Sequence, residues 1–191
     1  VVKTLARAAD GSYRHRSHSR PSGAAKMFTS VEWFEEGQFE VVQGKVRPLS
    51  FLEYRVGADK PLLHSARFAW KAKQIFYANG VTVPLPCGTQ DQGSILFALM
   101  LNPPVPGTQQ TIHISSGKKL RVYHYVHAGS ETLTTTLGAI KTTVIERPPL
   151  DNDSESFRVW LATGRGNLPV RITTQKRGQE TVLELESVSG L

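Results

Sequence analysis

The chain has 191 residues, the length of one ordinary domain and enough to bury a sizeable core. Hydrophobic residues make up 39% of it and charged residues 20%, which is typical of a soluble globular protein and excludes a disordered or collagen-like chain. The longest apolar run, residues 95–101, is far shorter than the roughly 20 residues that a membrane-spanning helix needs. We therefore expect one domain over residues 1–191 and no segment that crosses a bilayer.

The net charge of +7 is spread unevenly along the chain. Residues 1–20 carry five basic residues against one aspartate, whereas the rest carries 18 basic against 15 acidic residues. Nucleic-acid-binding proteins gather Lys and Arg over one face with aromatic residues between them, so specific nucleic-acid binding is not expected. The basic segment, which holds Arg14, Arg16 and Arg20, is either a solvated hairpin or attracted to an anionic lipid or polysaccharide surface.

Turn signals predict a β-rich first half. Asp10-Gly11 and Asn79-Gly80 each predict a hairpin, because these residues tolerate the positive φ angles of a tight turn. Glu35-Glu36-Gly37 is expected to join two further strands, and residues 24–28 to form one helical turn. The strands predicted in this half cover residues 1–9, 12–19, 29–34, 38–43, 49–56, 64–70, 74–78 and 81–85.

One helix is predicted, over residues 92–101. Thr89 or Asp91 can cap its start, and Asn102-Pro103-Pro104 ends it. This helix is apolar nearly all round, so we expect it to be buried. Its expected buried side chains are Leu96, Phe97 and Met100, packed against strand residues such as Val170 and Ile172.

The second half again reads as strands. Near its end, Leu168, Val170 and Ile172 alternate with Arg171 and Thr173, which is typical of a sheet with one wet face. The predicted strands cover residues 110–114, 120–127, 131–136, 139–147, 156–162, 169–176 and 181–188, with a polar loop at 148–154. Because helices between the strands are missing, a doubly wound fold is excluded. We predict a mainly β protein whose antiparallel sheet curls into an open or closed β-barrel with one buried helix.

Metal ligands and cofactor motifs are not indicated. The pairs His15/His18 and His124/His127 lie three residues apart in probable strands, where such residues face opposite sides. The acidic run 151–155 resembles a calcium loop but lacks the glycine and the glutamate that such a loop needs. We expect no metal and no cofactor.

Catalytic motifs are equally weak. No Gly-x-Ser-x-Gly elbow is present, and Cys87, the one cysteine, is expected to be a free thiol in a turn. Gly164-Arg165-Gly166 has too few glycines for a dinucleotide site and is interpreted as a turn between two strands. A non-enzymatic protein is therefore expected.

Several motifs, taken in their order and spacing, point to a family. They are Asp10–Tyr13, Val83–Asp91 followed by Ser94–Leu101, Leu137–Thr142, Arg147, Val159–Ala162 and Leu168–Ile172. Together they resemble DUF3108, an exported bacterial domain family of unknown function. The resemblance extends over nearly the whole chain. It implies a largely β protein of the Gram-negative periplasm, made with a signal peptide and without an established activity.

Four residues in the matched motifs are candidates for a ligand-facing role: Gln90, Asp91, Trp160 and Arg171. Each also has a structural interpretation. Gln90 and Asp91 can satisfy the free amides at the helix start, and Trp160 can cover the barrel mouth. Arg171 can pair with Glu184 or Glu186 on the next strand.

The leading hypothesis is a non-enzymatic, monomeric periplasmic module that binds an amphiphile or an envelope polymer. The alternatives are a structural or protein-interaction module of the cell envelope without a small ligand, and a hydrolase acting on envelope polymers. The expected partners are a lipid, a polysaccharide or an envelope protein, with peripheral membrane contact. An apolar cavity of about 300 Å³ or more would favour the amphiphile, whereas a filled interior would favour the interaction module.

Overall fold

The computed structural model describes residues 1–21, 30–57, 63–149, 155–176 and 178–190. Most of these residues lie in strands, and one α-helix is found among them, which confirms the prediction of a mainly β fold. The chain forms two compact units, residues 1–97 with 113–121, and residues 98–112 with 122–191. The prediction of one domain over residues 1–191 stays a prediction, because two compact units can belong to one domain.

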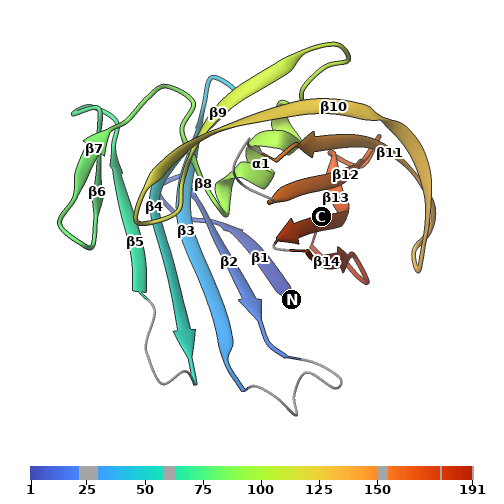
Figure 1. The fold of residues 1–191 in the computed structure, drawn as a ribbon, viewed down its shortest axis with the longest axis horizontal. Coiled ribbons are helices and arrows are strands. Elements are labelled where there is room, and N and C mark those ends of the chain that lie inside the picture. The colour runs from blue at the N-terminus through green and yellow to red at the C-terminus, as the bar shows by residue number, and fades with distance from the viewer. Residues whose placement is uncertain (22–29, 58–62, 150–154, 177, 191) are drawn as a thin grey trace. The chain divides into compact units, whose positions relative to one another are not determined.

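The first unit contains a seven-stranded sheet in which the strands follow chain order and neighbouring strands are antiparallel (Figure 1). Asp10-Gly11 and Asn79-Gly80 form the two predicted hairpin turns. The strands are β1 (Val2–Arg7), β2 (Tyr13–Ser19), β3 (Glu32–Val42), β4 (Lys45–Val56), β5 (Leu63–Ala69), β6 (Gln74–Tyr77) and β7 (Thr82–Pro84).

The turn predicted at Glu35-Glu36-Gly37 is wrong, because all three residues lie inside β3. The chain instead reverses at Gln43-Gly44, whose φ angles of 52° and 71° suit a tight hairpin turn. Gly37 serves a different purpose: a Cβ added there would lie 2.2 Å from Nε2 of His15. The helical turn predicted at residues 24–28 lies outside the described residues.

A second seven-stranded sheet has the order β14-β13-β12-β11-β10-β9-β8. Neighbouring strands from β10 to β14 are antiparallel, whereas β8 and β9 are parallel. The predicted curved, mainly antiparallel β fold with one helix is confirmed, and its strands are divided between two sheets rather than one. The strands are β8 (Gln90–Asp91), β9 (Gln109–Ser115), β10 (Leu120–Thr135), β11 (Gly138–Arg147), β12 (Ser156–Ala162), β13 (Leu168–Lys176) and β14 (Gln179–Glu184).

Two β-bulges change the predicted pattern of this sheet. The strands predicted at 120–127 and 131–136 are one strand, β10, whose pairing with β11 shifts between His127 and Gly129. Figure 1 shows β10 as a strongly bent ribbon, as expected for a bulged strand. A second shift lies between Trp160 and Leu161, where β12 pairs with β13. The simple alternation predicted around Val170 is therefore interrupted.

The helix α1 (Ser94–Leu101) begins three residues after Asp91 and ends before Asn102. Its most buried apolar side chains are Ile95 and Leu99, whereas Leu101 is 52% exposed, so the helix is only partly buried. Phe97 is half-buried, and its ring lies 5.0 Å from the ring of Phe39 and 5.7 Å from that of His15. These two rings take the place of the predicted partners Val170 and Ile172.

Each unit has its own apolar core. The core of the first unit is formed by Phe51, Ala66, Phe68, Ile75, Tyr77 and Leu85. That of the second unit is formed by Leu133, Ile140, Val144, Trp160, Ala162 and Val170, with Leu185 packed against it. The single interior that the helix was expected to fill is therefore replaced by two separate cores.

Candidate functional site

The second unit has an apolar hollow of about 430 Å³. Two residues of its lining, Ile140 and Val170, belong to the buried core and are only 4% and 2% exposed. Two others, Leu137 and Val188, are 38% and 47% exposed and so lie toward solvent. The complete lining is Leu137, Ile140, Arg165, Gly166, Leu168, Val170, Leu185 and Val188. This volume lies within the usual range for sites of small ligands.

Arg165 is the charged residue of this lining, and the turn that carries it is well fixed. The Arg165 amide donates to the carbonyl of Ala162, and the Leu168 amide donates to the carbonyl of Arg165, both over 3.2 Å. The Asn167 side chain also donates to the carbonyl of Met100 over 2.9 Å. The structure confirms that Gly164-Arg165-Gly166 is a turn between two strands, but no pattern in the sequence indicates the hollow beside it.

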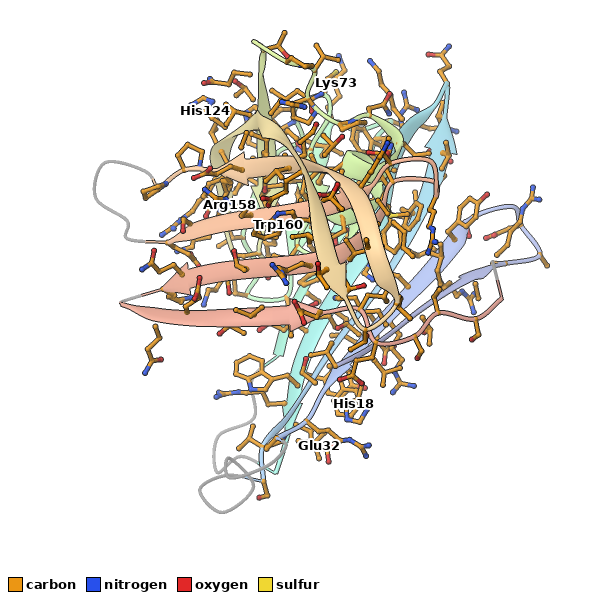
Figure 2. The ribbon with its side chains drawn as sticks, turned by 90° about the vertical axis from the view of Figure 1, so that its right-hand side faces the viewer. His18, Glu32, Lys73, His124, Arg158 and Trp160 are labelled. Carbon is orange, nitrogen blue, oxygen red and sulfur yellow. The ribbon has the colours of Figure 1, made fainter. Side chains whose placement is uncertain are left out.

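Trp160 belongs to the core beneath the hollow, together with Ile140 and Val170, but not to the lining itself. It is 6% exposed, and its Nε1 donates a hydrogen bond to Glu131. The guanidinium of Arg158 lies 5.8 Å from the Trp160 ring centre (Figure 2). Trp160 is thus held in place by its neighbours and supports the floor of the hollow.

Arg171 lies across from Trp160 on β13, with its guanidinium 5.7 Å from the Trp160 ring centre. Its Nε donates to Oε1 of Glu184 over 2.7 Å, which confirms the predicted cross-strand pair. Because both partners are partly exposed, such a pair contributes less than about 1 kcal/mol to stability. The structure therefore brings Trp160 and Arg171 together, next to the hollow rather than in its lining.

Gln90 and Asp91 lie in the first unit and are both buried, at 3% and 0% exposure. Gln90 does not cap the helix; its side-chain amide donates to the carbonyl of Val46 over 2.9 Å. Asp91 does cap it, because its Oδ1 accepts the amides of Gly93 and Ser94, both over 2.8 Å. The Ser94 hydroxyl in turn accepts the Asp91 amide over 2.9 Å, which completes a reciprocal capping box.

A buried histidine lies beside this cap, and the sequence analysis missed its importance. His15 on β2 is 6% exposed, and its Nε2 lies 3.9 Å from Oδ1 of Asp91. Backbone glycines make room for the ring: a Cβ at Gly37 or at Gly93 would approach ring atoms to 2.2 Å and 2.1 Å. We call His15, Gly37, Asp91 and Gly93 the histidine cluster. Glycines that face a histidine from distant positions leave no local signal in a sequence.

Burial shifts the titration of this cluster. It lowers the pKa of His15 to about 4, and the nearby charge of Lys3 acts in the same direction. Burial also raises the pKa of Asp91 to about 6, against the hydrogen bonds from Ser94 and Gly93. The pKa of Glu35 is raised as well, mainly by burial. At neutral pH the cluster therefore holds a neutral imidazole beside a carboxylate.

Arg14 and Arg16 of the basic segment lie on the face of β2 opposite to His15. Arg14, Arg16 and Arg20 are all exposed. Nε of Arg16 lies 3.1 Å from Oε1 of Glu36, so its charge is locally balanced. On the same strand, Nε2 of His18 lies 2.5 Å from Oε2 of Glu32 (Figure 2). Of the three arginines, Arg16 is thus the one with an acidic partner among the described residues.

Among the described residues, no group of three or more His, Cys, Asp or Glu side chains is placed to hold a metal ion. None of the helices in that part of the chain is long and apolar enough to cross a membrane. Cys87 is a free and exposed cysteine. The hollow of the second unit and the histidine cluster of the first remain as candidates for function.

Comparisons with known proteins agree with this fold. A crystal structure titled as a beta-barrel-like protein of the domain of unknown function DUF1849, from Brucella abortus, is similar with a TM-score of 0.52 and 12% sequence identity. The match covers 94% of this chain and 84% of that one, and at this identity it shows the fold alone. Among the curated proteins no match was found. The model of the family described as "Protein of unknown function (DUF3108)" matches residues 2–185, and the chain therefore belongs to the DUF3108 family.

Proposed function

We propose that this protein is a non-enzymatic module of the bacterial cell envelope that binds the apolar part of an amphiphile. The observation that carries the proposal is the apolar hollow of the second unit. Its volume of about 430 Å³ exceeds the roughly 300 Å³ at which small-ligand sites begin. Its floor residues Ile140 and Val170 are fixed in the core, so the hollow is already formed without a ligand.

Apolar burial supplies the expected affinity. Each methylene group moved from water into an apolar site contributes about 0.8 kcal/mol. Ten such groups would contribute roughly 8 kcal/mol, from which an association cost of at least about 4 kcal/mol is subtracted. The remaining roughly 4 kcal/mol corresponds to a dissociation constant of about 1 mM, and each further buried methylene group would tighten it about fourfold.

The experiment is a titration with N-phenyl-1-naphthylamine, a neutral apolar probe whose fluorescence rises on burial. Leu137→Trp and Val188→Trp place large side chains at the exposed side of the hollow. We expect each to weaken probe binding at least about fivefold by reducing the space. Val182→Trp is the matched control, since Val182 is 50% exposed on β14 and does not line the hollow.

Two results would contradict the proposal. One is the absence of saturable probe binding by the unmodified protein. The other is equal binding by the control and by both hollow variants, which would place the probe elsewhere. Either result would favour the structural or protein-interaction module instead.

Binding to an anionic envelope polymer through the basic segment has less support. Arg14 and Arg20 are exposed, but Arg16 lies against Glu36. Salt-dependent binding to anionic vesicles, lost when Arg14 and Arg20 are changed to Gln, would restore this function as a candidate.

Location in the periplasm is part of the proposal and rests on the exported character expected of the family. Cell fractionation of the native host tests it. The mature protein is expected with the periplasmic fraction, after removal of a signal sequence. Recovery from the cytosol with an uncleaved leader would contradict it.

A further inference from the structure

We propose that the ligand of the hollow is an amphiphile with a single chain and an anionic head group, bound with its tail inside and its head at Arg165. This inference rests on the proposed function and names the ligand class for the same site. It is carried by the size of the hollow and by the position and surroundings of Arg165.

The size of the hollow limits the number of chains. Liquid water occupies about 30 Å³ per molecule, so 430 Å³ corresponds to roughly fourteen water volumes. A methylene group is close to a water molecule in size. The hollow therefore accommodates one chain of about a dozen carbon atoms, whereas the paired tails of a diacyl lipid would leave one tail in water.

The charge of the lining selects the head group. Leu137, Leu168, Leu185 and Val188 surround the space with aliphatic side chains, and Arg165 adds one exposed cation. A guanidinium presents a planar fork of donors that fits the two oxygens of a carboxylate or a phosphate. An amphiphile whose tail enters this space would bring an anionic head within reach of that fork.

The other arginines near the hollow differ from Arg165 in their surroundings. Arg158 is 2.8 Å from Oε2 of Glu146, and Arg171 is 2.7 Å from Oε1 of Glu184. Arg165 has no acidic partner within 4.0 Å in the part of the chain that the structure describes. Its charge is thus available to a ligand, while its backbone is held by the turn.

The test compares four dodecyl compounds below their micelle concentrations at pH 8: dodecanoate, dodecyl phosphate, neutral dodecyl maltoside and cationic dodecyltrimethylammonium. Calorimetric titration gives each dissociation constant. We expect the two anions to bind about tenfold or more tightly than the other two, which is the typical contribution of a charge-assisted hydrogen bond. Their ratio distinguishes a carboxylate head from a phosphate head.

Variants of Arg165 test whether this side chain causes the preference for anionic head groups. Arg165→Gln should remove the tenfold difference, and Arg165→Lys should keep part of it, because an ammonium retains the charge but not the fork. Lys119→Gln is the matched control: it removes one exposed positive charge from the turn between β9 and β10, and should leave the preference unchanged.

The outcomes separate the two proposals. Equal affinity for all four compounds, or an anion preference that survives in Arg165→Gln, overturns this inference while leaving amphiphile binding intact. Failure of every compound to bind overturns the proposed function together with it. Tighter binding of a diacyl phosphatidylglycerol than of dodecanoate would contradict the single chain.

Discussion

The histidine cluster and the hollow differ in how closely their residues fill the space between strands. Around His15, two glycines approach the ring so closely that one added carbon at either would come within 2.2 Å of it. At the hollow, eight residues leave about 430 Å³ free. The first region buries polar groups in a space that is completely filled, whereas the second leaves apolar groups around a space that is open.

This difference indicates where the protein can accept a ligand. A filled polar cluster gains stability only if its groups stay in place, because a buried polar atom without a partner costs about 1 to 3 kcal/mol. Nε2 of His15 and Oδ2 of Asp91 lack hydrogen-bond partners among the described residues, so the cluster already carries such a cost. The hollow carries no comparable cost and can bind apolar groups without losing internal hydrogen bonds.

The largest effect is expected at Phe97, whose ring packs on His15 and Phe39. Phe97→Ala should lower the free energy of unfolding by about 3 kcal/mol, the lower end for buried aromatics because Phe97 is half-buried. Urea melts measure this. Leu101→Ala on the same helix is the matched control: Leu101 is 52% exposed, and its loss should cost about 0.5 kcal/mol or less. Equal costs for the two variants would show that Phe97 does not cover the cluster.

The next effect comes from adding one carbon to the cluster. Gly93→Ala should destabilise the protein by about 2 to 3 kcal/mol, because the new Cβ would lie 2.1 Å from a carbon of the His15 ring. Alanine is otherwise favoured over glycine near a helix start by up to about 1 kcal/mol, so the sign of the change is informative.

A double-mutant cycle assigns this cost to the histidine. In the background of His15→Ala the clash is absent, and Gly93→Ala should then be neutral or stabilising. A cost that persists without the imidazole would mean that Gly93 is required for another reason.

The sequence predicted most strands because their signals are local. Asp10-Gly11 and Asn79-Gly80 carry their turn chemistry within two residues, and both hairpins were found. Gly37 misled the prediction, since a glycine needed for space looks the same in a sequence as one needed for a turn. The two strands predicted at 120–127 and 131–136 are joined as β10 through the bulge at Gly129, whose φ angle is 121°.

The candidate site was harder to predict than the fold. Asp91 was identified as a possible helix cap and is one, because a cap and its amides are neighbours in the chain. Trp160 and Arg171 were ligand-facing candidates, and they lie beside the hollow rather than in its lining. The lining combines two turns, two strands and the segment after β14, and no local pattern reports that such distant residues leave a space between them.

Titration of the histidine cluster gives a third, smaller effect. The pKa of Asp91 is about 6 in the folded protein, against an ordinary value of 3.8. As the pH falls, the folded state therefore binds the proton before the unfolded state does, and this group adds stability between pH 6 and pH 4. The pKa of His15 is about 4 in the folded protein, against an ordinary value of 6.5. Here the unfolded state binds the proton first, so this group removes stability over the same pH range. The two contributions nearly cancel.

Single variants should separate the contributions of Asp91 and His15 to the change of the unfolding free energy with pH. Relative to the unmodified protein, Asp91→Asn should lose about 2 kcal/mol between pH 6 and pH 4, and His15→Gln should gain about 2 kcal/mol. Asparagine still caps a helix, so the first variant changes the charge and keeps the cap. Lys3 and Glu35, the charged neighbours of the cluster, remain in both variants. Urea melts at several pH values measure the slopes, and parallel profiles for all three proteins would refute the assigned shifts.

The smallest change in unfolding free energy is expected at the hollow, and it tests directly whether the hollow is less tightly packed than the histidine cluster. Leu137→Trp adds far more volume than Gly93→Ala does, yet Leu137 is 38% exposed and borders open space. The indole ring of the variant can lie over the floor formed by Ile140 and Val170 without displacing them. The apolar area that it buries there offsets the cost of placing a larger side chain in the turn. We therefore expect a change in unfolding free energy within about 0.5 kcal/mol, measured by the same urea melts. A loss as large as that of Gly93→Ala would show that this region is as tightly filled as the histidine cluster, and a ligand could then enter only by displacing core side chains.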